Sequence, residues 1–304
     1  MSKSQNILVS VCMVSYNQER YVREALDSVL MQKINFAIEI IVSDDCSADE
    51  TQQILQEYAT TYPDIVKPIY GQRNLGYPNN QRRSLEAATG KYIALCDCDD
   101  YWIDPYKLQK QVDYLETHPE CAICFHNVMH VYEGHPESRT LLNPLWFPTE
   151  LTIEDMLTRK WFLPTNSEVF RREYLTFPEW YDSVLHIDYV INLMVSQHGT
   201  LHYIPDVMAV YRHTAISVNA EHRDGEWGYM LFHSQTMKTI HEKMRDVIDD
   251  KYKDLLEKRI AFYDEEVKRY ENEQYYENHW YARIFRPKTY TRRIKKSLLN
   301  ILQK

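Results

Sequence analysis

The sequence predicts an α/β protein with a mainly parallel sheet flanked by helices, followed by a helical C-terminal extension. Three observations predict this fold class. Apolar runs alternate with helix-like segments through the first 132 of 304 residues. Clusters of polar side chains follow three of those apolar runs, as expected at the carboxyl edge of a parallel sheet. From residue 224 onward the spacing of apolar residues is helical.

The predicted strands of the first 132 residues are short apolar runs, and the segments between them show helical spacing. In the segment 18–32, for example, apolar residues recur at positions 22, 25, 26, 29 and 30. The predicted strands are 7–17, 37–47, 66–72, 91–97 and 121–132. The predicted helices are 18–32, 48–62, 79–89 and 104–118.

Two of these helices carry start signals. Ser47 is expected to cap the helix 48–62, and Glu50 stands three residues later, which is the spacing of a capping box. Asp104 is expected to cap the helix 104–118, with Pro105 in its first turn.

The later part of the chain is less regular. The stretch 133–165 is rich in proline and aromatic residues, and it is expected to form loop and short helix over a cleft. A helix is predicted at 187–197, with Asp188 in its first turn. Apolar residues keep a spacing of three or four between 252 and 270, which predicts a long amphipathic helix.

The charge distribution limits the classes of partner. The net charge of −9 argues against general nucleic-acid binding. The segment 283–304 nevertheless holds eight Lys or Arg and no acid, so the remainder of the chain carries −17. In a helix, Ile294, Leu298, Ile301 and Leu302 would share one face and Lys and Arg the other, a pattern typical of a helix lying on a membrane surface. A solvated helix packed on the protein body is the alternative.

The six cysteines include a C-x-C at 96–98 and a C-x-x-C at 121–124. A zinc site built from these four residues is conceivable. Because both cysteines of the second pair lie in an apolar strand segment, buried structural thiols are the favoured interpretation.

The strongest chemical signal is the knot of acids at Asp97, Asp99 and Asp100. These carboxylates follow directly on an apolar strand segment, and close carboxylates repel each other unless a positive charge lies between them. Oxygen ligands suit Mg²⁺ or Mn²⁺, and Mg²⁺ is usually shared with substrate phosphates. Neither a P-loop nor a G-x-G-x-x-G motif is present, so a bound diphosphate is expected to be held chiefly through the metal.

Four blocks, taken in order and spacing, carry a resemblance to a known family. They are VSVCMVSYNQERYVREALDSVLMQ, EIIVSDDCSADET, ATGKYIALCDCDDYW and PYKLQKQVDYL. Together they resemble the family 2 glycosyltransferases, whose Rossmann-like fold is called GT-A. The resemblance is strong over residues 7–132 and weaker over 160–219. It implies inverting transfer of a sugar from a nucleotide sugar, with UDP favoured, to a hydroxyl of a glycan or lipid-linked acceptor.

The resemblance assigns roles on the nucleotide side. Ser15, Tyr16 and Asn17 are expected to line the nucleotide pocket. Asp45, with Asp44 beside it, is expected to meet the base. Two more residues complete this side: Asn74, in the nucleotide-side loop, and Asp97, near the ribose or the metal.

The resemblance also implies a metal-bound diphosphate. Asp99 is expected to coordinate Mn²⁺ or Mg²⁺, with Asp97 beside it and His213 as a further metal or phosphate ligand. Asp100 and Trp102 are expected to orient the site or contact the acceptor. Gln81-Arg82-Arg83 departs from the family's usual Arg-Asn, which leaves open whether either arginine meets the phosphates.

An inverting displacement needs a base to take the acceptor proton, and the resemblance points to Asp188. The family often has another acid directly before this position, where this chain has Ile187. Asp182 and Asp206 are the competing candidates. A plain helix-capping role for Asp188 is the structural alternative.

The resemblance divides the chain into residues 1–220, with a nucleotide-binding half (1–132) and an acceptor-side half (133–220), and a helical region 221–304 ending in the basic segment 283–304. No apolar run is as long as a membrane span. A cytoplasmic enzyme in peripheral contact with the inner face of the cell membrane is therefore expected, with a homodimer possible. The alternative functions are a nucleotidyltransferase, a glycoside hydrolase and a non-catalytic carbohydrate-binding protein.

Overall fold

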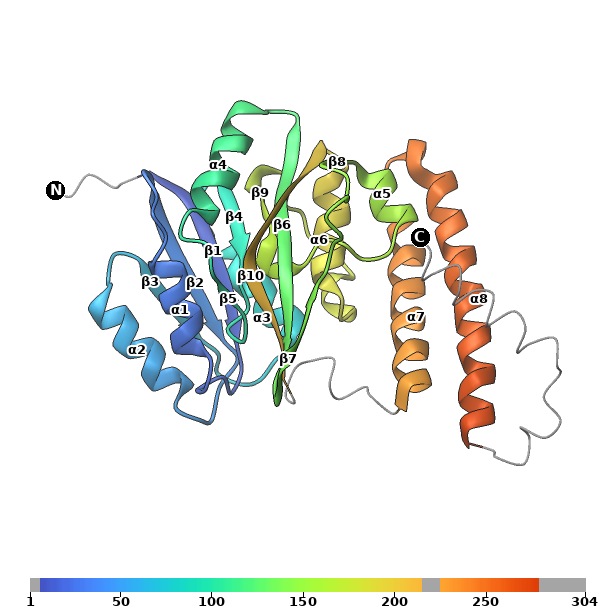
Figure 1. The fold of residues 1–304 in the computed structure, drawn as a ribbon, viewed down its shortest axis with the longest axis horizontal. Helices are drawn as coiled ribbons and strands as arrows, with labels where there is room; N and C mark the ends of the chain where they lie inside the picture. Colours follow the sequence, from blue (N-terminus) through green and yellow to red (C-terminus); the bar gives the residue numbers. More distant parts are fainter. Residues whose placement is uncertain (1–5, 215–224, 279–304) are drawn as a thin grey trace.

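The computed structural model of the protein describes residues 6–214 and 225–278, and it has the predicted α/β architecture (Figure 1). A ten-stranded sheet has the order β3-β2-β1-β4-β9-β6-β10-β5, with β7 pairing with β6 and β8 with β10. The strands β3, β2, β1, β4, β6 and β10 run in the same direction, and β9 is antiparallel between β4 and β6. The predicted mainly parallel sheet is confirmed.

The strands and helices have the following bounds. The strands are β1 (Ile7–Ser15), β2 (Ala37–Asp44), β3 (Val66–Tyr70), β4 (Tyr92–Leu95), β5 (Tyr101–Trp102), β6 (Cys121–Tyr132), β7 (His135–Leu141), β8 (Glu150–Leu151), β9 (Val169–Arg171) and β10 (Thr200–His213). The α-helices are α1 (Val22–Leu30), α2 (Thr51–Thr61), α3 (Tyr77–Glu86), α4 (Lys107–Thr117), α5 (Ile153–Thr158), α6 (Ile187–Ser196), α7 (Gly225–Met244) and α8 (Lys253–Asn278).

The alternation of side chains along the strands explains the layers. In β1, Val9, Val11 and Met13 belong to one apolar core, whereas Cys12 belongs to the other. The first core also contains the apolar faces of α1, α2 and α4, and the second contains those of α3, α5, α6, α7 and α8. Because successive strand residues point to opposite faces, one apolar run can supply both cores.

The two predicted helix caps are wrong in detail. The residue before α2 is Glu50, whose side chain does not cap the helix; Asp49 Oδ1 accepts the Thr51 N–H at 3.0 Å instead. The Ser47 hydroxyl instead donates to the Asp44 carboxylate. The helix α4 begins after Tyr106; Asp104 accepts the Tyr106 N–H at 2.8 Å and pairs with Lys110. In both places the predicted cap residue makes other local contacts in the loop before the helix.

The region 133–213 contains more strand than its sequence indicated. None of the strands β7, β8, β9 and β10 was predicted, because their apolar residues have no regular spacing. The helix predicted at 187–197 is confirmed as α6, and the long helix predicted at 252–270 is confirmed within α8.

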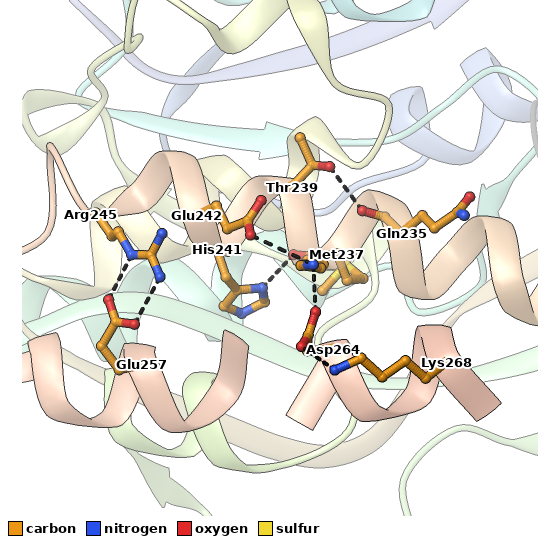
Figure 2. A network of polar contacts seen from close by, with 10 residues as sticks. Gln235, Met237, Thr239, His241, Glu242, Arg245, Glu257, Asp264 and Lys268 are labelled. Atoms are coloured by element: carbon orange, nitrogen blue, oxygen red, sulfur yellow. Dashed lines mark hydrogen bonds and ion pairs between the residues drawn. The ribbon is translucent and has the colours of Figure 1, made fainter. Parts of the chain in front are cut away.

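Helices α7 and α8 lie side by side as a hairpin next to α5 and α6 (Figure 1). Ion pairs tie the two helices together: Arg245 binds Glu257 through two nitrogens at 2.6 and 2.8 Å, and Lys238 pairs with Asp264 (Figure 2). Leu256 and Ile260 of α8 are buried in the core. The basic segment 283–304 lies outside the described residues.

Candidate active site

A cavity of about 400 Å³ lies at the carboxyl ends of the parallel strands. Both the nucleotide-binding half and the acceptor-side half predicted from the sequence contribute to its walls. Among its lining residues are Ser15, Tyr16, Asp45, Asn74, Asp97, Asp99, Asp100 and Asp188, all of which were candidate site residues. The walls also include Gln18, Gly76, Tyr77, Asn80, Thr165, Leu185, His186, Tyr211 and Arg212.

Two of the predicted nucleotide-side residues hold the loops behind the cavity instead of lining it. Asp44 is fully buried, and its carboxylate accepts hydrogen bonds from Ser15 Oγ, Ser47 and Gln52. Asn17 has a left-handed backbone (φ 53°), and its Oδ1 accepts the Ala48 N–H at 2.8 Å. These contacts join the β1 and β2 loops at the edge of the sheet.

Asp45 both lines the cavity and organises one of its walls. Its carboxylate accepts the Leu75 N–H at 3.0 Å and the Gly76 N–H at 2.8 Å. Asn74 Oδ1 accepts the Gly76 N–H as well, at 2.9 Å. Gly76 has φ +85°, a backbone conformation that favours glycine. The loop 74–76 therefore depends on Asp45 for its position.

The acidic knot (Asp97, Asp99 and Asp100) lines the cavity. The Asp100 carboxylate accepts the Arg212 N–H at 2.7 Å, and the Tyr77 hydroxyl is 3.4 Å from Asp97 Oδ2. Burial and the charge of Asp99 raise the pKa of Asp97 and that of Asp100 well above the usual range of a carboxyl group. Burial also raises the pKa of Asp99 to about 6. Uncompensated negative charge of this kind favours a bound cation.

The donor set of the knot fits a divalent cation. Within the described ranges, no group of three or more His, Cys, Asp or Glu side chains is arranged to hold a metal ion. The carboxylates of Asp97 and Asp99 would therefore supply the protein ligands, and a bound phosphate group and water the others, as is common for Mg²⁺. The four cysteines at 96–98 and 121–124 are buried free thiols, in line with the structural interpretation.

His213, predicted as a further metal or phosphate ligand, is not among the cavity-lining residues. Its Nε2 lies 2.8 Å from Nδ1 of His130, and its ring stacks on Tyr132 with 4.3 Å between centroids. Trp102 does not line the cavity either. It is 1% exposed, its indole N–H donates to the Asn166 carbonyl, and it belongs to the core.

Asp188, in the first turn of α6, is the base candidate that faces the cavity. The Thr165 hydroxyl donates to its Oδ2 at 2.9 Å. The two competitors face other partners, because Asp182 pairs with Arg82 at 2.8 Å and Asp206 pairs with Lys110 at 2.7 Å. Neither competitor lines the cavity.

The arginines near the site have distinct positions. Arg83 donates to Ser43 Oγ and to the Asp44 carbonyl, so it holds the end of β2 and does not line the cavity. Arg212 does line it; its guanidinium pairs with Glu24 at 2.6 Å and lies over the rings of Tyr21 and Tyr101. The resemblance had indicated this chain segment without choosing Arg212.

Several lining residues carried no sequence signal. Tyr77, Thr165, His186 and Tyr211 stand in segments without a polar cluster at a strand end. Burial and the nearby carboxylates, Asp97 first, raise the pKa of the Tyr77 hydroxyl well above its usual range. It is therefore a hydrogen-bond donor beside the acidic knot.

An acidic cavity lies at the carboxyl edge of this sheet, and Asp188 is among its lining residues. The profile of the Glycosyl transferase family 2 matches residues 10–176, which is more than half of the chain. The chain belongs to this family.

Relatives in sequence agree with this membership. An uncharacterised protein of Mycobacterium tuberculosis, Rv1520, is 43% identical over 211 residues, covering 68% of this chain and 59% of the relative. The putative teichuronic acid biosynthesis glycosyltransferase TuaG of Bacillus subtilis is 34% identical over 152 residues, covering 49% and 57%. The chain thus spans about three fifths of the length of these relatives.

Solved structures show the same fold. Residues 1–349 of Staphylococcus aureus TarS align with a TM-score of 0.62 at 19% identity, covering 84% of this chain and 71% of that one. The mannosyltransferase PcManGT of Pyrobaculum calidifontis, solved with GDP-Man and Mn²⁺, aligns with a TM-score of 0.63 at 16% identity, covering 99% and 84%. TarS has also been solved with UDP and with UDP-GlcNAc. Among the described helices, none has the length and apolar character needed to span a membrane.

Proposed function

We propose that the protein is a metal-dependent inverting glycosyltransferase that moves a sugar from a nucleotide sugar to a hydroxyl group. The observation that carries the proposal is that Asp97, Asp99 and Asp188 line one cavity together with Asp45 and Asn74. Carboxylates suited to a cation, nucleotide-side residues and a candidate base are the parts that such a transfer needs.

In this proposal, different residues of the cavity bind the nucleotide and the cation. Asp45 and the loop 74–76 receive the nucleotide, and Asp97 and Asp99 would hold Mn²⁺ or Mg²⁺. When bound, the cation neutralises the diphosphate leaving group. The complexes of structural neighbours with UDP, UDP-GlcNAc and GDP-Man with Mn²⁺ support this assignment. UDP is the favoured nucleotide.

The chemical step is a single displacement. The acceptor oxygen attacks the anomeric carbon, the bond from that carbon to the diphosphate oxygen breaks, and the hydroxyl proton goes to the Asp188 carboxylate. Thr165 holds Asp188 Oδ2 at 2.9 Å, which fixes the direction of the carboxylate. One displacement at the anomeric carbon inverts its configuration.

The acceptor in this proposal is a glycan or lipid-linked glycan, as in cell-envelope polysaccharide synthesis. The named function of TuaG supports that class of acceptor. Residues 133–220 form the acceptor-side half and 1–132 the nucleotide-binding half. The basic segment 283–304 provides peripheral contact with anionic lipid at the cytoplasmic face of the membrane, a proposal that rests on its sequence pattern.

The test is a calorimetric titration of UDP and of GDP, each with Mn²⁺ and with EDTA, into the native protein and Asp99→Asn. We expect nucleotide binding that requires Mn²⁺ and is lost in the variant. Binding that is equally strong in EDTA would contradict the metal–diphosphate arrangement. Binding of neither nucleotide would remove the basis of the proposal.

A further inference from the structure

The Asp97 carboxylate has a single hydrogen-bond donor within residues 6–214 and 225–278, and that donor is the Tyr77 hydroxyl. The hydroxyl lies 3.4 Å from Asp97 Oδ2, and Oδ1 has no hydrogen bond from the described residues. Both side chains line the cavity. Because Asp97 is a cation ligand in the proposed function, the direction of its carboxylate matters, and one donor sets that direction.

The Tyr77 hydroxyl is itself held by a chain of two further side chains. Gln81, one turn later in α3, donates from Nε2 to the Tyr77 hydroxyl at 3.1 Å. The Tyr181 hydroxyl in turn donates to Oε1 of Gln81 at 3.0 Å. The hydrogen bonds therefore run from Tyr181 through Gln81 and Tyr77 to Asp97.

The direction of this chain follows from the residue types. An ionised carboxylate only accepts hydrogen bonds, so Tyr77 donates to Asp97 and accepts from Gln81. The Gln81 amide then presents its oxygen to Tyr181, which donates. Burial raises the pKa of both tyrosines well above the usual range, so both hydroxyl groups keep the protons that the chain needs.

The far end of the chain is packed between α3 and the segment before α6. Gln81 is 1% exposed, and Tyr181 is fully buried. Beside them, Arg82 of α3 pairs with Asp182 at 2.8 Å, which is a second link between the same two segments. Neither Gln81 nor Tyr181 lines the cavity, so these two side chains can act on it only through the Tyr77 hydroxyl.

We infer that Tyr77 orients the Asp97 carboxylate for a bound divalent cation. Gln81 and Tyr181 hold the Tyr77 hydroxyl for this contact from outside the cavity. The inference rests on the proposed function and adds three positioning residues to its cation site. A hydrogen bond at Oδ2 limits rotation of the carboxylate, and Oδ1 remains available as a ligand.

The chain also joins two segments that are far apart in the sequence. Tyr77 is the first residue of α3 and directly follows the loop 74–76. Tyr181 begins a short 3-10 helix that precedes α6, the helix that carries Asp188. A replacement at Tyr181 is therefore expected to change cation binding, although its side chain lies outside the cavity.

The contacts suggest matched variants. Tyr77→Phe removes the donor and keeps the ring. Gln81→Met combined with Tyr181→Phe removes both supporting groups together, so that neither is left buried without a partner. A triple variant removes the whole chain. Tyr92→Phe is the control, because Tyr92 is also fully buried but lies at the opposite end of β4 and does not line the cavity.

The first measurement is the Mn²⁺ dissociation constant, obtained from the electron paramagnetic resonance signal of free Mn²⁺ with and without UDP. We expect Tyr77→Phe to raise it about three- to tenfold, the effect of one hydrogen bond. The Gln81→Met, Tyr181→Phe variant should raise it about twofold, because the hydroxyl stays but loses the bond that polarises and orients it. Tyr92→Phe should bind Mn²⁺ like the native protein.

The triple variant tests whether the supporting residues act through Tyr77. Once the Tyr77 hydroxyl is absent, loss of Gln81 and Tyr181 should have no further effect, so the triple variant should bind Mn²⁺ as Tyr77→Phe does. A loss equal to the product of the two separate losses would show that the supporting residues act by another route, and would overturn their positioning role.

The same titrations separate this inference from the proposed function. Mn²⁺ binding that is lost in Asp99→Asn and unchanged in Tyr77→Phe would overturn the inference and leave the proposed function standing. Native protein that binds no Mn²⁺, with or without UDP, would overturn both.

A second measurement needs no cation. The Cζ resonance of Tyr77 in ¹³Cζ-tyrosine-labelled protein is assigned with Tyr77→Phe and compared among the other variants. We expect Tyr181→Phe and Asp97→Asn each to shift this resonance, and Tyr92→Phe to leave it in place. An unchanged resonance in Tyr181→Phe would show that Gln81 does not transmit the contact, and would overturn the positioning role whatever the Mn²⁺ titrations show.

Discussion

The Thr165 hydroxyl donates a hydrogen bond of 2.9 Å to Oδ2 of Asp188, and both residues line the cavity. The two residues are 23 positions apart, and they come from a short 3-10 helix (Thr165–Ser167) and from the first turn of α6. The hydrogen bond fixes the orientation of the Asp188 carboxylate, which a helix-capping role alone would not require.

The first prediction concerns this contact. Thr165→Val keeps the shape of the side chain but removes the donor, so the Asp188 carboxylate loses its orientation. We expect kcat to fall about 10- to 100-fold, because a hydrogen bond to a charged group contributes about 1.5–3 kcal/mol. The measurement is transfer to a glycoside acceptor, with the UDP dissociation constant unchanged. Thr165→Ser, which retains the donor, is the control; equal losses in both variants would contradict the role.

The second prediction compares two of the three base candidates, Asp188 and Asp206. Asp188→Asn should reduce kcat by about 10²–10⁴-fold, the usual contribution of a general base. Asp206→Asn, which breaks an exposed ion pair with Lys110, should leave kcat within about twofold. The measurement is the rate of sugar transfer by each variant at a saturating donor concentration. A large loss in Asp206→Asn with normal turnover in Asp188→Asn would reverse the assignment.

The third prediction concerns the loop that Asp45 holds. Asp45→Ala leaves the N–H groups of Leu75 and Gly76 without their carboxylate acceptor, so the nucleotide-side wall loses its position. We expect UDP affinity to fall at least about tenfold, given the strength of hydrogen bonds to a charged group. The measurement is the UDP dissociation constant, obtained by calorimetry. Asn74→Ala, which removes one acceptor of the Gly76 N–H, should have a smaller effect.

The fourth prediction is a pH dependence of stability at the other edge of the sheet. Glu39, 1% exposed, accepts hydrogen bonds from Ser10 and Thr89 and pairs with Lys67 at 2.6 Å. Burial opposes its ionisation, but the bonds from Lys67, Ser10 and Thr89 outweigh it and lower the pKa to about 2.

The sign of the effect follows from this shift. Between pH 4.5 and 2 the unfolded chain binds a proton at Glu39 that the folded chain does not bind, so folding stability falls as the pH falls through that window. Urea unfolding of native protein and Glu39→Gln between about pH 7 and pH 3 tests this. The difference in free energy of unfolding between the two proteins should shrink toward low pH; a constant difference would contradict the prediction.

The first half of the fold could be predicted from the sequence because its signals lie in short, continuous segments of the chain. In β1, β2 and β4 the apolar runs are buried on both faces, and each is followed by polar residues at the carboxyl edge. In a parallel sheet those edges meet, so the positions of Asp45, Asp97 and Asp99 along the chain are enough to predict that they lie near one another. Asp188 was predicted as the base from the family resemblance and from its position in the first turn of a predicted helix.

Other site residues were beyond this reasoning. Trp102 belongs to the same short motif as Asp99, yet its side chain turns into the core and bonds the carbonyl of Asn166. His213 directly follows Arg212 in β10, and only Arg212 lines the cavity. Tyr211 and Arg212 both line the cavity, whereas His213 contacts His130 and Tyr132 instead, so the path of β10 past the cavity decides which of its residues reach the site.

By itself, the sequence determined the alternation of strands and helices, the acidic knot at Asp97, Asp99 and Asp100, and the family. Those properties depend on residue type and on spacing along the chain. Only the tertiary structure decided that Thr165 holds Asp188, that Asp182 and Asp206 face other partners, and that Gln81 joins Tyr181 to Tyr77. Such contacts join residues far apart in sequence, and packing of the helices against the sheet, not local pattern, brings them together.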